Sequence, residues 1–295
     1  MESGILILEE APKEADFPRE AFEAMNDIET MHFWSRARNV VIKAMLDLIP
    51  GTARSRSLLD VGCGTGSVSA WLRSLGYHTV GMDMWLDGLK YAASRLSAPG
   101  ICCNARHMPF RGCFDVVGLF DVIEHIEDDE ELLRTSARAL KSGGHLIVTV
   151  PADRRLWSPY DDVFGHKRRY TRAQLLAVLE RAGLTVQRVS YYNTLLWPVQ
   201  YAYRRWQSAR HTPVPSRAEL TRALLKVPPR YINAPLRWIM SMEALWVTHF
   251  SGFFGGALIA LARLDQEGQQ VGATKGRRSQ HTAEGHLDGV LGQCA

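Results

Sequence analysis

Cysteine, excess charge and long apolar runs are all scarce in this 295-residue chain. Its five cysteines are an odd number, and no two of them have the spacing of zinc ligands. This pattern favours a reduced, cytoplasmic protein over a secreted one that is held by disulfides. Lysine and arginine total 35 against 31 for aspartate and glutamate, so the overall charge predicts no nucleic-acid partner.

Membrane-targeting features are equally sparse. The first ten residues lack a basic region and contain only four consecutive apolar residues, which predicts no signal peptide. The most apolar segment, 238–262, is interrupted by Glu243 and His249 and divided by Gly255-Gly256. A helix crossing lipid would bury the Glu243 carboxylate at a cost of roughly 3 kcal/mol. We therefore expect contact with a membrane at most, and no span.

From residue 57 onward, short apolar runs alternate with helical stripes. The expected strands are 57–61, 78–82, 101–103, 114–120, 145–150, 184–192 and 257–264. Helices are expected within 18–49, after residue 66, at 85–96, at 129–141 and after Thr171, which opens a capping box with Gln174. Nearly continuous apolar strands alternating with helices predict an α/β fold, with a doubly wound, Rossmann-like parallel sheet covered on both faces.

The domain organisation follows from where this alternation holds. We expect an N-terminal helical lid at 1–50 and a core formed by 51–192 and 256–264. Residues 193–255, rich in proline, tryptophan and tyrosine, are expected to form a helical cap inserted before the last strand. Residues 265–295 contain few apolar side chains and are expected to be a disordered tail.

A glycine-rich loop, LLDVGCGTG at 58–66, joins the first expected strand to its helix. Glycines there allow backbone N–H groups to approach a ligand closely. Ser67 replaces the third glycine or alanine of a dinucleotide fingerprint, and the Gly-Lys-Ser/Thr ending of a P-loop is absent. Asp60, ahead of the glycines, would repel a pyrophosphate but suits an ammonium. Asp83, after the second strand, can accept hydrogen bonds from two ribose hydroxyls. The ligand predicted has a ribose, an ammonium and no phosphate.

With this loop and these two acids, the chain resembles the class I S-adenosylmethionine-dependent methyltransferases, in particular the type 11-like domains that act on small molecules. The likeness covers most of 32–190 and implies S-adenosyl-L-methionine as cofactor. It also implies a seven-stranded sheet whose last strand, 257–264, is antiparallel. Asn104, where many relatives have aspartate, and Ala105 would lie beside the adenine, and Asp121 beside the methionine portion.

The family's HFW…R element is present as His32-Phe33-Trp34 with Arg38 and would close the N-terminal helix over the cofactor. Packing of Phe33 and Trp34 against the core is the alternative explanation. The cofactor-binding residues expected from the loop and the resemblance are Trp34, Arg38, Asp60, Gly62, Cys63, Gly64, Gly66, Asp83, Met84, Asn104, Ala105 and Asp121.

The segment LFDVIEHIEDDEE at 119–131 concentrates acids around His125. A metal site is one explanation, but carboxylates also suit the start of a helix, and no histidine-plus-carboxylate spacing recurs elsewhere. We therefore predict no metal. Glu124-His125 matches a signature common in the family. The Asn/Asp-Pro-Pro-aromatic turn of enzymes that methylate adenine or glutamine amides is absent here, which favours small-molecule acceptors.

The stretch PYDDVFGHKRRYT at 159–171 fits a nucleic-acid patch, a solvated loop or an active-site lid when taken alone. It follows the fifth expected strand, at the edge where such sheets bind ligands. Arg168 and Arg169 just before a helix start oppose the helix dipole, so we expect Asp161 and Asp162 to hold them. Relatives carry a similar LWS…D…GH.RRY run, which supports a lid.

Methyl transfer requires an aligned acceptor and, for most acceptors, a base. His166 and Tyr160 are the candidates in this loop, the tyrosine only when relayed by Asp161 or His166. A purely structural role for His166 is the alternative. The expected catalytic residues are therefore His166, Tyr160 and Asp161.

Aromatic residues are dense around this loop and at the start of the expected cap. They suit an apolar or aromatic acceptor held by stacking, and they also favour a sulfonium. The expected substrate-binding residues are Trp157, Tyr170, Tyr192 and Trp197.

The function predicted is methylation of a small hydrophobic natural product, indole-like or phenolic. An isoprenoid or lipid-linked acceptor at the membrane face, and a catalytically silent scaffold that binds the cofactor, are alternatives. The sequence leaves open whether carbon, nitrogen or oxygen is methylated, and whether the protein is a homo-oligomer.

Overall fold

The computed structural model describes residues 4–9, 19–98, 100–209 and 226–265. One eight-stranded sheet runs through it in the order β1-β4-β3-β2-β5-β6-β8-β7. The strands are β1 (Ile5–Ile7), β2 (Ser57–Val61), β3 (His78–Asp83), β4 (Gly100–Cys102), β5 (Phe114–Phe120), β6 (Leu140–Pro151), β7 (Leu184–Tyr192) and β8 (Ala257–Leu264). All pairs from β1 to β6 are parallel, and β8 is antiparallel to both β6 and β7. This confirms the Rossmann-like sheet with its antiparallel last strand.

The predicted count of seven strands is wrong because the N-terminal segment adds an eighth. Residues 5–7 pair in parallel with 100–102 and extend the sheet beyond β4. Ile5 is fully buried there against Leu89 and Cys102. An apolar run of four residues near the start of the sequence has too little periodicity to predict a strand. The segment 1–50 is therefore partly sheet, and not helical throughout as predicted.

Four of the strands begin and end where the sequence predicted, namely those at 57–61, 114–120, 184–192 and 257–264. β6 begins at Leu140, five residues earlier than expected. A register shift opposite Phe114 and Val116 keeps this glycine-containing stretch within the sheet. Tertiary pairing, which has no local signal in the sequence, sets this boundary.

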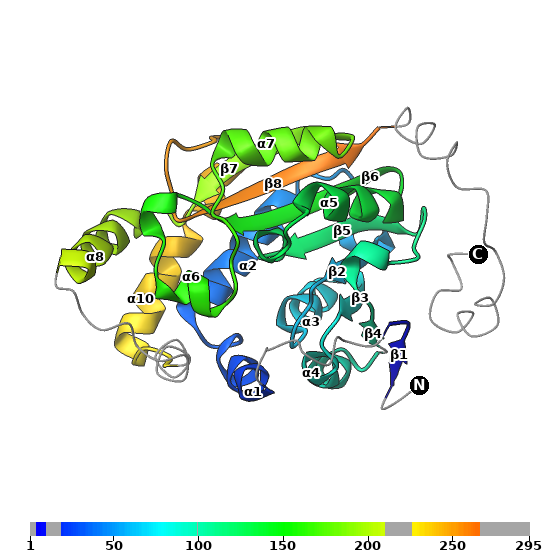
Figure 1. The fold of residues 1–295 in the computed structure, drawn as a ribbon, viewed down its shortest axis with the longest axis horizontal. Coiled ribbons are helices and arrows are strands. Elements are labelled where there is room, and N and C mark those ends of the chain that lie inside the picture. The colour runs from blue at the N-terminus through cyan, green and yellow to red at the C-terminus, as the bar shows by residue number, and fades with distance from the viewer. Residues whose placement is uncertain (1–3, 10–18, 99, 210–225, 266–295) are drawn as a thin grey trace.

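Helices cover both faces of the sheet (Figure 1). The α-helices are α1 (Arg19–Ile28), α2 (Phe33–Leu46), α3 (Ser67–Ser74), α4 (Leu86–Leu96), α5 (Asp129–Ala139), α6 (Pro159–Val163), α7 (Arg172–Arg181), α8 (Trp197–Ala209), α10 (Arg230–Ser241) and α11 (Ala244–Val247). Single 3-10 turns are η1 (Ala53–Ser55), η2 (Ala105–His107), η3 (Ile123–His125) and η4 (Arg154–Leu156). The capping box predicted at Thr171 and Gln174 is present at the start of α7.

The core has a separate apolar cluster on each face of the central strands. On one face, Leu132 of α5 and Leu179 of α7 pack against strands that include β5 and β6. On the other, Ile42 of α2, Leu72 of α3 and Val247 of α11 do the same. Full burial of each such side chain contributes about 2 kcal/mol. This packing fixes the strand ends, and with them the loops that follow.

The helices between β7 and β8 are tied to the rest of the protein by polar contacts. Asn233 of α10 accepts a hydrogen bond from the backbone N–H of Phe33 (2.8 Å) and donates one to the carbonyl of Met31 (2.9 Å), at the start of α2. The fully buried carboxylate of Glu243 accepts from the backbone N–H groups of Asn193, Thr194 and Leu195. Within the described residues, none of the helices combines the length and apolarity needed to cross a bilayer.

Replacing Glu243 with alanine is expected to lower the free energy of unfolding by about 3 kcal/mol, because three backbone donors lose a charged acceptor in a buried place. Thermal unfolding of the purified protein followed by circular dichroism measures the effect. Glu127→Ala, which removes an exposed carboxylate, is the control. Equal melting temperatures for the two variants would contradict this role of Glu243.

Candidate functional site

The residues predicted to bind the cofactor come together at one edge of the sheet. Apart from Trp34 and Arg38, which lie on α2, they lie at or just after the carboxyl ends of β2, β3, β4 and β5, which are neighbours in the sheet. Figure 1 shows the arrowheads of β5 and β6 directed toward the end of the molecule where α6, α8 and α10 lie. Ligands of open α/β sheets bind at this edge.

The glycine loop needs its glycines for conformation and for space. Gly62, Gly64 and Gly66 all have left-handed backbone angles, with φ of 72°, 53° and 74°. A Cβ on Gly62 would lie 2.7 Å from Val122, and one on Gly66 would lie 2.7 Å from Ala92 of α4. A Cβ on Gly64 would meet nothing within 4 Å. Gly64 is therefore the point of the loop that faces open space.

The loop offers a ligand fewer N–H groups than the sequence suggested. The N–H groups of Gly62 and Cys63 donate to the carbonyl of Met82, that of Gly66 donates to the carbonyl of Cys63, and that of Gly64 donates to Asp83. The expectation that these N–H groups meet the ligand stays a prediction, because in this structure they are engaged within the protein. A loop whose donors are used internally suits a cationic group, such as an ammonium, better than a phosphate.

Asp83 and Asp60 are both buried on either side of this loop. The Asp83 carboxylate accepts from the N–H groups of Gly64 (2.8 Å) and Trp85 (2.9 Å), so it anchors the loop with one oxygen and the start of α4 with the other. Burial raises the pKa of Asp83 above its ordinary value. Burial also raises the pKa of Asp60 to about 7, although the Ser69 hydroxyl donates a hydrogen bond to it.

The HFW…R element brings Arg38 to the end of β5. Arg38 forms an ion pair with Asp121 and lies over the ring of Trp34, 4.8 Å from the ring centroid. Asp121 has a left-handed φ of 59° and also accepts a hydrogen bond from Thr149 (3.2 Å). A non-glycine residue held in this region is strained and is common at functional sites. Trp34, Arg38 and Asp121, all predicted to bind the cofactor, thus form one group of side chains in contact.

The remaining predicted cofactor residues differ in what they present to a ligand. Asn104 caps η2 by accepting from the N–H of Arg106 (3.1 Å), and Ala105 follows it, partly buried against the core. The carbonyl of Met84 accepts from the thiol of Cys102. Cys63 packs its side chain against β3, because its sulfur lies 2.9 Å from where a Cβ on Gly81 would be. Cys63 therefore presents backbone, and not its thiol, to the loop's open side.

Asp161 is the hub of the basic loop. Its buried carboxylate accepts from Nδ1 of His166 (2.8 Å), from both ends of the Arg169 guanidinium (2.8 and 3.1 Å), and from the N–H and hydroxyl of Ser158. Burial alone would raise the pKa of Asp161, but the hydrogen bonds from His166 and Arg169 lower it to about 2. The predicted ion pair between Asp161 and Arg169 is present.

The partner of the other arginine was not predicted. Arg168 pairs with Asp129 of α5 (2.8 Å) and donates to the carbonyl of Glu127. Asp162, the expected partner, instead accepts from the indole N–H of Trp157 (3.1 Å). Asp129 lies 39 residues before Arg168, so only the folded chain brings them together. The loop is pinned to α5 as well as within itself.

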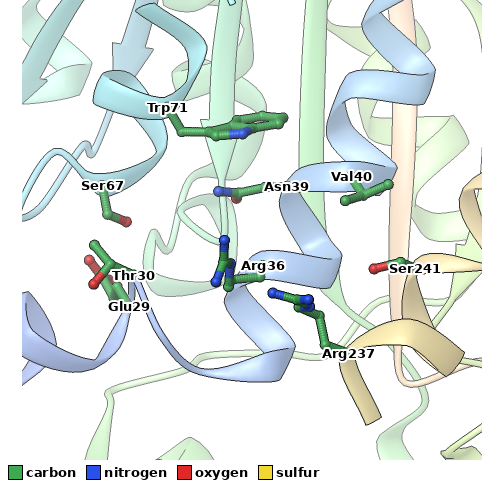
Figure 2. A pocket seen from close by; sticks show the side chains of 9 residues that line it. All are labelled: Glu29, Thr30, Arg36, Asn39, Val40, Ser67, Trp71, Arg237 and Ser241. Carbon is green, nitrogen blue, oxygen red and sulfur yellow. The ribbon is translucent and has the colours of Figure 1, made fainter. Parts of the chain in front are cut away.

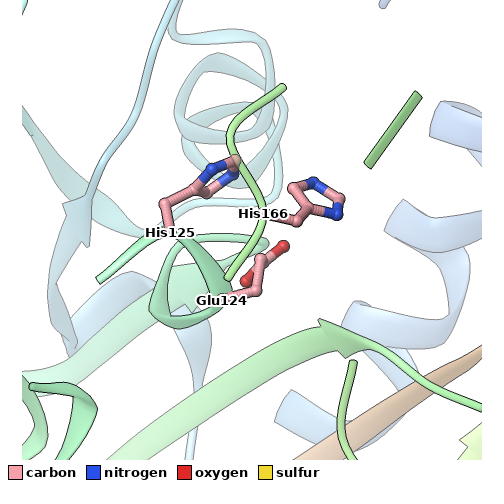
Figure 3. A group of neighbouring side chains, drawn as sticks. All are labelled: Glu124, His125 and His166. Carbon is pink, nitrogen blue, oxygen red and sulfur yellow. The ribbon is translucent and has the colours of Figure 1, made fainter. Parts of the chain in front are cut away.

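Glu124, His125 and His166 converge next to this hub (Figure 3). One ligating atom from each lies within 4.8 Å of the other two. The two imidazole rings meet edge to face, with centroids 4.8 Å apart. Burial and the neighbouring His166 lower the pKa of His125 to about 4. No metal was predicted for 119–131, because no histidine-plus-carboxylate spacing recurs elsewhere in the sequence, and His166 joins the cluster only through the fold.

The predicted substrate-binding aromatics fall into two groups. Tyr170 and Tyr192 are buried, in the clusters on opposite faces of the sheet, and Tyr170 donates to Asp129 (2.5 Å). Their geometry is that of core residues, in contrast to the prediction. Trp157 and Trp197 are half-buried. Trp197 donates to Asp153 (2.8 Å) and is stacked on Tyr201, with ring centroids 5.1 Å apart. The side chain of Tyr160, predicted to be catalytic, is outside the part of the chain that the structure describes.

A pocket of about 360 Å³ borders the glycine loop at Ser67 (Figure 2). Its lining comes from the end of α1, from α2, α3 and α10, and none of it was predicted. The lining residues are Glu29, Thr30, Arg36, Asn39, Val40, Ser67, Trp71, Arg237 and Ser241. The volume suits a small molecule. The charged side chains of Arg36, Arg237 and Glu29 differ from the apolar acceptor cavity that the sequence suggested.

Comparison with known proteins identifies a methyltransferase domain in the chain. Residues 59–148 match the family model of the methyltransferase domain. A ubiquinone biosynthesis O-methyltransferase from Caulobacter vibrioides is 36% identical over 99 residues, which are 31% of this chain and 39% of that relative. The chain thus spans about two fifths of the length of this curated relative.

Solved structures extend the likeness to the whole fold. The [4+2]-cyclase SpnF superposes with a TM-score of 0.52 at 21% identity, over 79% of this chain and 83% of that one. Phosphoethanolamine N-methyltransferase 2 of Haemonchus contortus, solved with S-adenosyl-L-methionine, has a TM-score of 0.51 at 17% identity, over 86% of this chain and 61% of that one. The chain therefore carries a methyltransferase domain at 59–148 and shares the fold of a methyltransferase solved with S-adenosyl-L-methionine, in agreement with the resemblance noted in its sequence.

Proposed function

We propose that this protein transfers the methyl group of S-adenosyl-L-methionine to a hydroxyl on an aromatic ring of a hydrophobic small molecule. The observation that supports it most directly is the pair of buried carboxylates, Asp60 and Asp83, on either side of Gly64, where a Cβ would meet open space. Asp83 would accept from the ribose hydroxyls, and Asp60 from the ammonium of the methionine portion. Arg38 and Asp121 would border that portion from α2 and β5.

On the acceptor side, the chain's own residues supply a base and its support. Asp161 holds Nδ1 of His166, which leaves Nε2 for a proton from the acceptor hydroxyl. Arg169 and Ser158 keep Asp161 ionised and fixed, so that the imidazole keeps one orientation. The new bond joins the acceptor oxygen to the methyl carbon as the carbon–sulfur bond breaks, and the proton passes to His166. The coproduct is S-adenosylhomocysteine.

Two observations favour a ring that carries an isoprenoid or other lipid chain over a free natural product. The curated relative acts, by its name, as an O-methyltransferase in ubiquinone biosynthesis. The cap also exposes large apolar side chains between α11 and β8, with Phe250 and Phe253 exposed to 69% and 99%. Such a surface suits a lipid chain or the bilayer in which it lies.

Incubation with radiolabelled cofactor and a panel of phenols, with and without a prenyl chain, tests the proposal. Transfer of label to oxygen, with prenylated phenols preferred, is the expected result, and mass spectrometry of the product identifies the methylated atom. Sedimentation with liposomes should be lost in Phe250→Ser/Phe253→Ser. This pair is a better test than removal of 238–254, which would also delete the buried Glu243. Labelled carbon or nitrogen would contradict the proposal.

A catalytically silent protein is a second candidate, favoured by one comparison. SpnF shares the fold and is described as a cyclase. A protein of this kind would bind S-adenosyl-L-methionine by calorimetry and yet form no S-adenosylhomocysteine with any acceptor of the panel. The same assay therefore separates the two candidates.

Cofactor binding is expected to weaken as the pH falls below about 7. Burial raises the pKa of Asp60 to about 7, and an ammonium binds only the ionised carboxylate. Binding then requires loss of the Asp60 proton, so affinity should fall toward tenfold per pH unit between pH 7 and 5.5. Over this window the cofactor's amino group, with a pKa near ~8, stays protonated. Calorimetry at each pH should show the slope in the native protein and none in Asp60→Asn.

A further inference from the structure

Glu124 is a buried carboxylate without a partner. The residue is fully buried, and neither of its carboxylate oxygens forms a hydrogen bond. The two nearest arginines are engaged elsewhere, Arg38 with Asp121 and Arg169 with Asp161. A buried carboxylate left in this way is costly unless it binds a cation or holds a proton.

Both nearby histidines are held in place by hydrogen bonds within the loop that contains His166. Asp161 accepts from Nδ1 of His166, which leaves Nε2 as the ring nitrogen available to a ligand. This carboxylate–histidine arrangement is the one that orients histidine ligands in metal sites. His125 hydrogen-bonds to the backbone at Phe164 and Gly165, which fixes its ring against the same loop.

From this cluster we propose that Glu124, His125 and His166 bind a divalent transition-metal ion of the zinc type. Two imidazole nitrogens and one carboxylate oxygen form a donor set known for zinc with an open coordination position. Within the described residues, this is the group whose donor atoms converge closely enough to hold an ion.

The cluster must tighten slightly when the ion binds. Its ligating atoms lie within 4.8 Å of one another, whereas donors at about 2.0–2.2 Å from one ion lie about 3–3.5 Å apart. We expect the loop before His166 to move so that the ligating atoms come closer together. Gly165 has a φ of 73° and open space where a Cβ would be, so the loop has room to shift. Three ligands leave at least one position for an acceptor oxygen.

The ion's binding stands independently of methyl transfer, and only its role toward the acceptor rests on the proposed function. An acceptor hydroxyl bound in the open position loses its proton more readily. His166 would then serve as a ligand, and not as the base assigned to it above. The two roles exclude each other within one catalytic cycle, so the dependence of turnover on the ion decides between them.

The test uses the full-length protein, stripped with a chelator and titrated with Zn²⁺ by calorimetry and with Co²⁺ by visible absorption. One ion per chain is expected, with affinity reduced about 100-fold in Glu124→Gln and in His125→Ala. Asp161→Asn, which loses the support of His166, should weaken binding 10–100-fold. His107→Ala is the matched control, because His107 lies beside Glu9 at the surface (3.3 Å) without a second histidine, and should bind as the native protein does.

Several outcomes would overturn the inference. One is absence of a bound ion in the native protein, and another is unchanged affinity in Glu124→Gln or His125→Ala variants that are folded by circular dichroism. A thiolate charge-transfer band with Co²⁺ would place the ion on the cysteines instead. Binding of S-adenosyl-L-methionine to the stripped protein is measured in parallel. If the native protein binds no S-adenosyl-L-methionine, that result counts against the proposed function and leaves the metal result unaffected.

Discussion

Replacing Asp83 with alanine is expected to weaken the binding of S-adenosyl-L-methionine by about 100-fold. The ribose hydroxyls lose a charged acceptor, and hydrogen bonds to charged groups contribute about 1.5–3 kcal/mol each. The loop also loses its anchor, because Gly64 donates its N–H to this carboxylate. Isothermal titration calorimetry with the cofactor and with S-adenosylhomocysteine measures the loss directly.

A matched control separates the ribose contact from the change in charge. Asp87→Ala removes a carboxylate four residues further on, which pairs with Lys90 at the surface (3.0 Å), and should leave the affinity unchanged. Asp83→Asn keeps the size and one acceptor oxygen, so it should fall between the native protein and the alanine variant. Native-like affinity in a folded Asp83→Ala would mean that the nucleoside binds elsewhere.

His166→Ala is expected to lower kcat by about 100-fold or more while leaving the Kd for the cofactor within a factor of about two. General base catalysis contributes about 10²–10⁴-fold, and the proposed function assigns His166 to the acceptor side of the site. Single-turnover transfer of labelled methyl, with cofactor affinity from calorimetry, gives the two quantities separately.

A different result is expected if the role of His166 is only structural. In that case turnover and cofactor affinity should fall together, since the loop pinned by Asp161 and Arg169 would loosen. Asp161→Asn should resemble His166→Ala in kcat if the carboxylate orients the ring. Assays with and without a chelator show which step is lost: turnover that survives chelation assigns His166 as the base, and turnover that requires an ion assigns it as a ligand.

The cofactor side of the site was predictable because its signals are local. Asp60 and the glycines lie within seven residues, and the turn after an apolar strand leaves few conformations for them. Asp83 follows at the end of the next strand, and parallel strands place their carboxyl ends at one edge. What local sequence could not show is that the loop's N–H groups are used by Met82, Cys63 and Asp83.

The acceptor side was predicted less well because its contacts are distant in sequence. Arg168 meets Asp129 across 39 residues, and His166 meets Glu124 and His125 across about 40. Acids at 127–131 looked like helix-start charges, and some are: Asp128 caps α5 by accepting from the N–H of Glu131. Tyr170 and Tyr192 were assigned to the substrate from aromatic density alone, which does not distinguish a core ring from a pocket ring.

Asn233 of α10 connects this helix to the start of α2. Its amide hydrogen-bonds to Met31 and Phe33, which precede it by about two hundred residues. The same helix α2 carries Arg38, which pairs with Asp121. Motion of α10 therefore reaches the start of α2, and a molecule that displaces one helix also disturbs the other. Under the proposed function, in which Arg38 of α2 borders the cofactor, an acceptor that displaces α10 should change the affinity for the cofactor.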